Sequence, residues 1–175
     1  MSDAPLVARM IEPDVADVAV IEDASFPQQR PAAGNVRLPT TEERLREELS
    51  RPWTRAWTAH EGKRIVGYLV SWHVADELHV LQVAASPSDR RRGFGRALVL
   101  RALEYAASER VRLVLLEVRR SNHAAIALYR RVGFAAVNVR RAYYDNGEDA
   151  VEMLAELDPA TGNRVLRDDE VALDP

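Results

Sequence analysis

Two glycines set among arginines give this 175-residue sequence its most distinctive chemistry. Glycine has no Cβ atom, so the backbone at Gly93 and Gly95 can turn sharply and approach a ligand closely. A helical pattern starts directly after them, and the first amides of such a helix lack partners and carry the positive end of the helix dipole. This combination favours a phosphate or diphosphate ligand, with a solvated arginine run at a surface helix as the alternative. The residues concerned are Arg90, Arg91, Arg92, Gly93, Phe94, Gly95 and Arg96.

The spacing of the two glycines differs from that of the common phosphate-binding loops. No Gly-Lys-Ser or Gly-Lys-Thr sequence follows, which argues against a P-loop. No third glycine follows three residues later, as the dinucleotide fingerprint requires. The pattern in this sequence is a basic residue with one glycine three positions after it and a second glycine five positions after it.

Glu117 is a single carboxylate in the apolar, strand-like run from Val111 to Val118. Burial raises the pKa of a carboxyl group unless a cation pairs with it. Glu117 is therefore either a general base that works near neutral pH or the partner of a nearby arginine. The spacing alone leaves both roles open.

Tyr129 lies seven residues after Asn122, two helical turns along one face of an expected helix. A tyrosine there is either a core aromatic or, with a hydroxyl pKa near 10, a proton donor. Asn122, or Ser121 before it, is expected to cap this helix.

Histidine and cysteine usage indicates neither a metal centre nor a thiol nucleophile. His73, His79 and His123 show no metal-ligand spacing, so no metal is expected. The sequence contains no cysteine, which excludes disulfides, zinc–thiolate sites and a cysteine nucleophile.

Strand and helix patterns alternate around these residues, which indicates an α/β or α+β fold. The expected strands at Leu78–Ala85 and Val111–Val118 are apolar on both faces, so a buried central position is expected for each. The other strands are expected at Leu6–Met10, Trp53–Ala59, Ile65–Val74, Phe134–Arg141 and Ala150–Leu157, and the helices at Asp14–Ala24, Glu42–Ser50, Gly93–Ser108 and from Asn122 to just before Gly133.

One domain over residues 1–157 suits this length. Residues 158–175 are charged, carry two prolines and have little periodicity, so a mostly disordered tail is expected. Gln28 to Thr40 reads as a long loop, of a length that is usually functional or disordered.

Composition places the chain among ordinary globular proteins, with 47% hydrophobic and 29% charged residues. It contains no long apolar run and does not begin like a signal peptide, so a cytoplasmic protein without a membrane partner is expected. The net charge of −3 argues against direct nucleic-acid binding, although arginines cluster locally.

The basic turn and the sequence after it resemble the GNAT N-acetyltransferases. Arg90-x-x-Gly93-x-Gly95 follows a strand that ends Val-Ala-Ala-Ser-Pro, as in the acyl-CoA diphosphate loop of that superfamily. Leu116 to Tyr129, Val132-Gly133-Phe134, Arg141 to Tyr144 and Gly147 to Ala150 make the similarity greatest to the RimI-type ribosomal-protein-alanine N-acetyltransferases. The similarity covers about half of the chain, from Leu78 to Leu157.

The resemblance implies a fold, a cosubstrate and residue roles. The fold is a mixed, mostly antiparallel, strongly twisted sheet, splayed between strands four and five and flanked by about four helices. The cosubstrate is acetyl-CoA, bound by the basic turn, by Asn122 and by backbone groups of Val83, Ala84 and Ala85. Glu117 becomes the base that accepts the proton of the attacking amine, directly or through water, and Tyr129 the acid that protonates the leaving thiolate.

The acceptor implied by the resemblance is a protein N-terminus, in particular the N-terminal alanine of a ribosomal protein. Two alternatives remain open, which are acetylation of a small amine or a lysine, and a non-catalytic acyl-CoA-binding regulatory module. The sequence from Phe26 to Thr40, where relatives help to hold the acceptor, departs from the family pattern. The oligomeric state is not indicated by the sequence.

Overall fold

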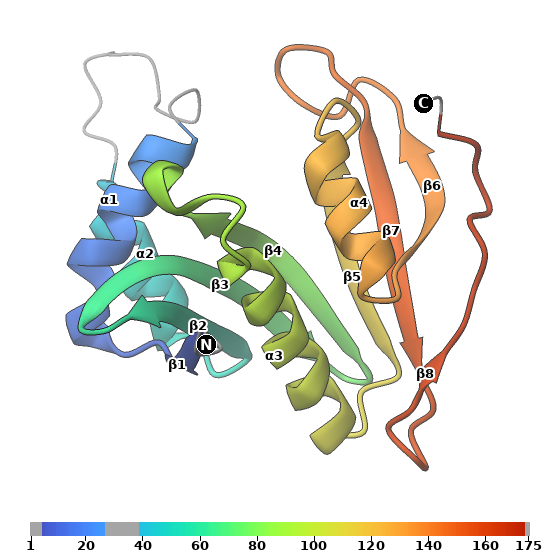
Figure 1. The fold of residues 1–175 in the computed structure, drawn as a ribbon, viewed down its shortest axis with the longest axis horizontal. Helices are drawn as coiled ribbons and strands as arrows, with labels where there is room; N and C mark the ends of the chain where they lie inside the picture. The colour runs from blue at the N-terminus through green and yellow to red at the C-terminus, as the bar shows by residue number, and fades with distance from the viewer. Residues whose placement is uncertain (1–4, 27–38, 174–175) are drawn as a thin grey trace. The chain divides into compact units, whose positions relative to one another are not determined.

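The computed structural model describes residues 5–26 and 39–173 (Figure 1). The loop expected from Gln28 to Thr40 lies almost wholly outside the described residues. The chain forms two compact units, one of Met1–Ser71 with Gln82–Arg101 and the other of Trp72–Leu81 with Ala102–Pro175. The single domain expected over residues 1–157 stays a prediction.

The described residues form one sheet of eight strands and four α-helices. The strands are β1 (Leu6–Arg9), β2 (Thr54–Glu61), β3 (Arg64–Val74), β4 (Glu77–Ala85), β5 (Leu113–Arg119), β6 (Ala135–Arg140), β7 (Ala150–Leu157) and β8 (Arg164–Val165). The helices are α1 (Val15–Ser25), α2 (Thr41–Ser50), α3 (Phe94–Ser108) and α4 (His123–Arg131), and short 3-10 turns span Glu12–Asp14 and Pro87–Asp89.

The strand order is β1-β2-β3-β4-β5-β7-β6, with β8 paired to β7. The pairs β1–β2, β5–β7, β6–β7 and β7–β8 are antiparallel, and β4–β5 is parallel. This confirms the expected mixed, mostly antiparallel sheet. The parallel register joins residues 77–80 of β4 to residues 113–116 of β5, which is only the first half of either strand.

In the first unit, α1 and α2 close an apolar core. Val15, Val18 and Leu45 from these helices are buried with Tyr68 of β3. Thr40 caps the start of α2, since its hydroxyl accepts from the Glu43 amide at 3.2 Å while the Glu43 carboxylate accepts from the Thr40 amide at 2.8 Å.

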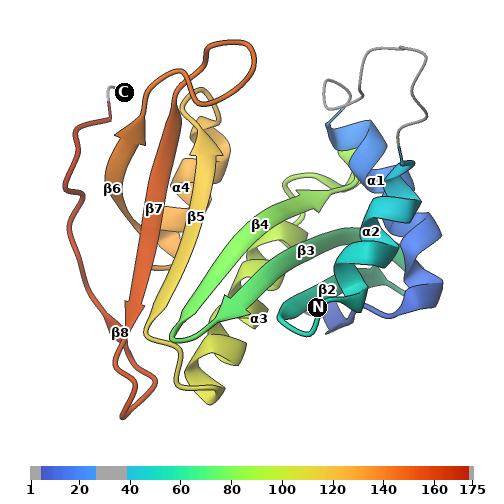
Figure 2. The same ribbon diagram turned by 180° about the vertical axis from the view of Figure 1, so that it is seen from behind.

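In the second unit, α4 lies along one face of β5 and β7, as both views show (Figure 1 and Figure 2). β5 pairs with β7 over its full length, from Leu113 opposite Glu156 to Arg119 opposite Ala150. The register of β6 on β7 shifts between Ala136 and Asn138, where a bulge disrupts the ladder.

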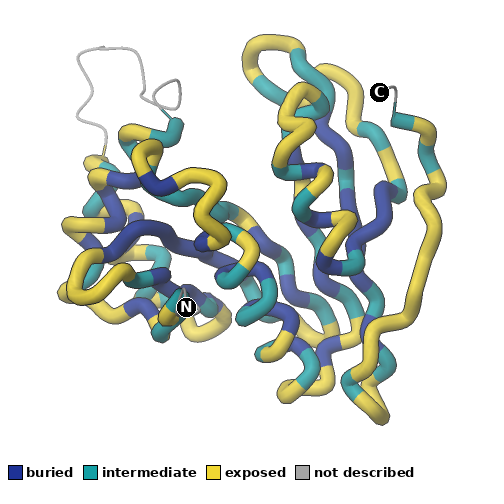
Figure 3. The backbone as a smooth tube through the Cα atoms, viewed as in Figure 1, coloured by how far each residue is buried: buried dark blue, intermediate teal, exposed yellow. Residues whose placement is uncertain are grey.

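Residues 158–173 follow a defined path along β7 and β6, whereas the sequence predicted mostly disorder there. β8 pairs with the end of β7, the Asp169 carboxylate accepts from the Ala136 amide at 2.8 Å, and the Glu170 amide donates to the Ala136 carbonyl at 2.8 Å. The tail is nevertheless mostly exposed (Figure 3). Its composition reflects solvent exposure, and its attachment depends on a few polar contacts that hydrophobic periodicity does not reveal.

No helix in the described ranges is long and apolar enough to cross a membrane.

Candidate active site

The basic turn leads directly into α3. Arg91 has φ +60° and Gly93 has φ +90°, so the chain passes through left-handed conformations just before the helix. Ala97 donates the first helical hydrogen bond, to the Gly93 carbonyl at 2.9 Å. The amides before Ala97 therefore have no partner within the helix, and Phe94 is buried beneath them.

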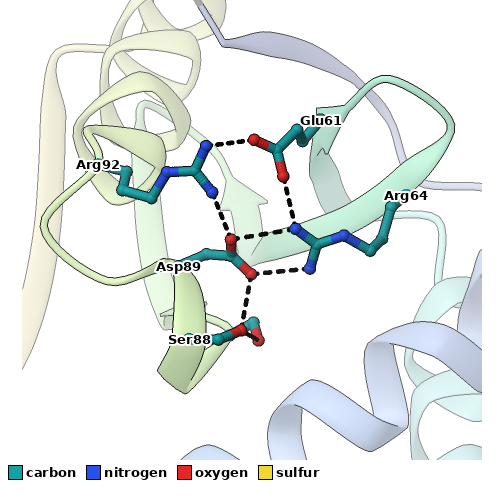
Figure 4. Close-up of polar contacts among 6 residues, drawn as sticks. Glu61, Arg64, Ser88, Asp89 and Arg92 are labelled. Atoms are coloured by element: carbon teal, nitrogen blue, oxygen red, sulfur yellow. Dashed lines mark hydrogen bonds and ion pairs between the residues drawn. The ribbon is translucent and has the colours of Figure 1, made fainter.

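The four arginines of the turn fall into two groups. Arg92 is held by ion pairs to Asp89, at 2.6 Å, and to Glu61 (Figure 4). Arg90, Arg91 and Arg96 are exposed, and their guanidinium groups have no ion pair within the described part of the chain. Only these three have an uncompensated charge to offer to an anion.

Asp89 is the centre of the contacts that hold Arg92. Its carboxylate is 3% exposed and accepts two hydrogen bonds from Arg64, at 2.8 and 3.1 Å, and one from the Ser88 hydroxyl at 3.0 Å. The Arg64 hydrogen bonds are the main reason why the pKa of Asp89 lies well below its ordinary value. Arg64 also pairs with Glu61, whose pKa is lowered chiefly by Arg92 (Figure 4).

The expected cosubstrate strand is β4, and its last residues are less buried than the sequence predicted. Val83, Ala84 and Ala85 are partly exposed, whereas the apolar pattern indicated a buried strand. A Cβ atom on Gly67 of β3 would lie 2.8 Å from the Ala84 carbonyl oxygen. β3 therefore approaches β4 here more closely than any other residue would allow.

The turn fits a diphosphate group. It combines helix-start amides, two glycines and three unpaired guanidinium groups, which are the donors that bind phosphate oxygens in proteins. The adenosine diphosphate part of an acyl-CoA molecule contains such a diphosphate group.

Glu117 lies in the second unit, on β5, with a side chain that is 34% exposed. Its Oε1 pairs with Arg140 at 3.0 Å, and its Oε2 accepts from the Tyr143 hydroxyl at 2.7 Å. Of the two roles left open by the sequence, the ion pair with an arginine is present. This contact does not exclude the role as a base, because both donors are exposed groups at the edge of the strand.

Arg140 relieves a repulsion between two carboxylates. Glu117 and Glu152 are direct cross-strand neighbours on β5 and β7, an arrangement that is unfavourable for like charges. Arg140 binds Glu117 at 3.0 Å and Glu152 at 2.6 Å, and Asn138 donates to Glu152 at 2.5 Å. The carboxylates raise the pKa of Arg140, which stays a cation.

These groups surround a pocket of about 470 Å³. Its lining is partly apolar, with Leu116 and Met153 among the apolar residues. Glu117, Glu152 and Arg140 are the charged groups, and Tyr143 and Tyr144 the tyrosines. The hydrogen bond to Glu117 is the main reason why the pKa of Tyr143 is raised, and burial is the main reason for Tyr144. Both tyrosines therefore stay protonated and can donate.

Tyr129 lies on α4 with its ring buried against Phe134, at 5.8 Å between ring centroids. Burial raises its pKa well above the ordinary value, so the hydroxyl keeps its proton. No residue in the described ranges forms a hydrogen bond with this hydroxyl. The structure therefore places this tyrosine in the core, and its role as a proton donor stays a prediction.

Asn122 caps α4 as expected, because its Oδ1 accepts from the Ala125 amide at 3.1 Å. The residue is exposed, so its amide nitrogen is free to serve as a donor. Neither Asn122 nor Tyr129 lines the pocket around Glu117.

Glu148 joins the loop between β6 and β7 to the start of α4. It accepts from the Ser121 hydroxyl at 2.5 Å, from the Ser121 amide at 3.0 Å and from Arg119 at 3.0 Å. These hydrogen bonds, those from Ser121 first, lower its pKa to about 2. Arg119 also stacks on Tyr144, with its guanidinium carbon 3.8 Å from the ring centroid. The loop that carries Tyr143 and Tyr144 is therefore anchored at both ends.

The described ranges contain no group of three or more histidine and acidic side chains placed to bind a metal ion.

The sequence did not reveal the partners of the expected site residues. Around the turn these partners are Glu61 and Arg64, at the ends of strands, and the buried Asp89 of the 3-10 turn Pro87–Asp89. Around Glu117 they are Arg140 and Glu152, on β6 and β7. The one available signal was a charge within an apolar strand, as for Glu152. Assigning its partner requires the strand register, which the sequence does not give.

Comparisons with known proteins agree with this geometry. The acetyltransferase (GNAT) family model matches residues 17–134, more than half of the chain. An Escherichia coli K12 ribosomal protein bS18-alanine N-acetyltransferase is 33% identical over 117 residues, covering 58% of this chain and 79% of that one. The Mycobacterium tuberculosis N-alpha-acetyltransferase RimI is 39% identical over 111 residues, covering 61% and 68%.

A Bacillus subtilis relative, named provisionally as a ribosomal protein bS18-alanine N-acetyltransferase, is 31% identical over 155 residues and covers 87% of this chain and 96% of that one. Among solved structures, the Escherichia coli ribosomal-protein-S18-alanine N-acetyltransferase superposes with a TM-score of 0.71 at 23% identity, over 97% of this chain and 99% of the other. The chain therefore belongs to the GNAT family, and it is an N-acetyltransferase.

Proposed function

We propose that this chain transfers the acetyl group of acetyl-CoA directly to the α-amine of a protein N-terminus, an N-terminal alanine of a ribosomal protein in particular. The observation that carries the proposal is Glu117, a carboxylate held by Arg140 and Tyr143 at the wall of a pocket of about 470 Å³. The names of the relatives from Escherichia coli and Mycobacterium tuberculosis support the choice of an α-amine.

The chemistry of the amine favours an N-terminus over a lysine. Attack requires the neutral amine, and an α-amino group has a pKa near 8 against about 10.4 for lysine. At neutral pH the neutral fraction of the α-amine is over a hundredfold larger. A single carboxylate of modest basicity therefore suits an N-terminus better.

In the proposed reaction the amine nitrogen attacks the thioester carbonyl carbon, a C–N bond forms and the C–S bond breaks. Glu117 accepts the proton from the amine, directly or through water, once the incoming amine has replaced the Tyr143 hydroxyl at Oε2. The Tyr129 hydroxyl gives its proton to the departing sulfur. Without cysteine in this sequence, no cysteine-bound acetyl group forms.

The basic turn supports the cosubstrate half of the proposal. Arg90, Arg91 and Arg96, together with the amides at the start of α3, hold the diphosphate, while the backbone of Val83, Ala84 and Ala85 and the side chain of Asn122 contact the rest of acetyl-CoA.

The test is CoA release from acetyl-CoA with a panel of acceptors. The panel contains peptides with a free N-terminal alanine, the same peptides N-blocked but carrying lysine, and polyamines. We expect release only with free N-termini. Release only with lysine or polyamines would leave the fold and cosubstrate in place but reject the acceptor, and binding without any release would favour a regulatory module.

The same assay with the variant Glu117→Gln tests the role of this residue. Loss of the base should lower kcat/KM for the peptide about 100-fold at pH 7 and less at pH 9, where most of the α-amine is already neutral. The matched control is Glu77→Gln, which removes a partly exposed carboxylate from β4 that binds His79 at 2.7 Å. If Glu117→Gln lowers kcat/KM equally at pH 7 and pH 9, the role of Glu117 as a base is contradicted.

A further inference from the structure

We infer that Arg64 and Glu61, which flank the turn of the β2–β3 hairpin, are positioning residues for acetyl-CoA, and that Arg92 of the basic turn acts with them and does not bind the diphosphate itself. The inference rests on the proposed cosubstrate site. It assigns a binding role to a hairpin that contains none of the residues expected to contact the ligand.

The first observation is that the Arg92 guanidinium is already engaged. It pairs with Asp89 at 2.6 Å and with Glu61 (Figure 4). It also lies over the Phe94 ring, with its central carbon 5.3 Å from the ring centroid. A guanidinium held on two sides by carboxylates has little net charge to offer to a phosphate.

The second observation is that Asp89 is fixed mainly from the hairpin. Arg64 binds both of its carboxylate oxygens in a bidentate pair, at 2.8 and 3.1 Å, and Asp89 is 3% exposed. A buried carboxylate is costly unless it is paired, and Arg64 supplies two of the four side-chain hydrogen bonds that Asp89 accepts. Glu61 completes the contacts by binding Arg64 at 2.5 Å and also binding Arg92.

The third observation is that the basic turn has an unfavourable backbone conformation. Arg91 lies at φ +60°, a region that is costly for a residue with a Cβ atom, and Gly93 at φ +90° follows two residues later. Such conformations persist where the surrounding contacts over-determine them. Asp89 and Arg92 lie immediately before and within this turn, so their contacts with the hairpin supply that constraint.

These observations connect the hairpin to affinity. If Arg64 is lost, the turn can leave the conformation that presents the α3 amides and the three unpaired arginines. The apparent Kd equals the intrinsic Kd divided by the fraction of molecules whose turn is in the binding conformation. If that fraction is one tenth, the Kd rises about tenfold. The acetyl-transfer step itself should change little once acetyl-CoA is bound.

The experiment is calorimetric titration of the full chain with acetyl-CoA at low and high salt, together with steady-state kinetics. The variants are Arg64→Ala, Arg92→Ala and their double mutant, with Arg64→Lys as the conservative change. Arg46→Ala is the matched control, because Arg46 forms two exposed ion pairs with Glu12 and Glu42 away from the turn. Arg90→Ala is the reference for a direct phosphate ligand, and thermal melts show which variants are folded.

We expect each single alanine variant to raise the Kd and the KM for acetyl-CoA about tenfold, with kcat nearly unchanged. The double mutant should match the single mutants, because both act through Asp89. Arg64→Lys should give an intermediate Kd, since an ammonium group cannot form the bidentate pair. Arg46→Ala should bind like the wild type, and only Arg90→Ala should reduce the salt dependence of binding.

Three results would overturn the inference alone. These are an unchanged Kd for folded Arg64→Ala or Arg64→Lys, a double mutant about a hundredfold weaker because the effects add, and a salt dependence for Arg92→Ala that is reduced as in Arg90→Ala. A wild-type chain that does not bind acetyl-CoA would overturn the proposed function as well.

Discussion

The protonation states of Tyr129 and Glu148 are set by their local environments. Burial keeps the Tyr129 hydroxyl protonated. Hydrogen bonds, those from Ser121 first, lower the pKa of Glu148 to about 2 and so keep it ionised at neutral pH. Glu117 is held by two exposed donors, Arg140 and Tyr143, which an acceptor can replace. These environments depend on contacts between residues that are far apart in the sequence.

Replacing Tyr129 by phenylalanine should lower kcat about 100-fold or more, because a general acid contributes about 10²–10⁴-fold. Acetyl-CoA affinity should not change, since the ring and its contact with Phe134 remain. The measurements are CoA release at saturating substrates and calorimetric titration. Tyr105→Phe is the control, because it removes a hydroxyl bound to His73 at 2.8 Å and should leave turnover intact. Unchanged turnover in Tyr129→Phe would remove this tyrosine as the acid.

Glu148 should make stability depend on pH in the acidic range. Its pKa is lowered from 4.5 to about 2, so its contribution is complete above about pH 4.5 and is lost as the pH falls toward 2. Glu148→Gln should therefore melt below the wild type at pH 7, and the difference should shrink between pH 4.5 and 2. Asp145→Asn, an exposed change in the same loop, should follow the wild type. A difference in melting temperature that stays constant with pH would contradict this account.

At the scale of elements, the sequence predicted most of the fold. Periodicity placed β3, β7 and α3 within a few residues of their observed bounds, because these elements bury one continuous apolar face or run. The cap at Asn122 could also be predicted, since capping depends on residues only three positions apart. The contacts of Arg64 with Asp89 could not be predicted, because they join the start of β3 to a turn 25 residues further along the chain.

Gly67 shows an element contact that the sequence did not reveal. Gly67→Ala would place a Cβ atom 2.8 Å from the Ala84 carbonyl, so β4 must shift at the residues expected to contact acetyl-CoA. We expect a loss of roughly 1–3 kcal/mol in the free energy of unfolding and a severalfold weaker acetyl-CoA affinity. Gly147→Ala is the control, because its Cβ would meet no atom within 4 Å although φ is +79°. Gly147→Ala should lower the free energy of unfolding through backbone strain alone and leave acetyl-CoA affinity unchanged. An equal loss of acetyl-CoA affinity in both variants would contradict the proposed contact between β4 and acetyl-CoA.

At the scale of the whole chain, the tail after Leu157 is the part for which sequence composition was least informative. Its polar residues predicted disorder, yet Asp169 and Glu170 bind the amide and carbonyl of Ala136 on the edge strand β6, and Asp169 also pairs with Arg130. These contacts satisfy backbone groups that would otherwise be available for pairing with another chain.

Ending the chain at Leu157 should therefore lower the free energy of unfolding by roughly 1–3 kcal/mol and increase self-association. Calorimetry and size-exclusion chromatography measure the two effects. Asp169→Asn should reproduce part of the loss. Asp168→Asn should not, because Asp168 is exposed and forms no hydrogen bond or ion pair within the described residues. A truncated chain that is as stable and as monodisperse as the full chain would show that the tail contributes little.

We propose that this enzyme directs acetyl transfer to an α-amine. The most direct measurement uses one peptide that carries both a free N-terminal alanine and an internal lysine, followed by mass-spectrometric location of the acetyl group at pH 7. We expect acetylation of the α-amine alone, with product formed about 100-fold more slowly when Glu117 is replaced by glutamine. Acetyl groups on the lysine side chain of the same peptide would contradict the account.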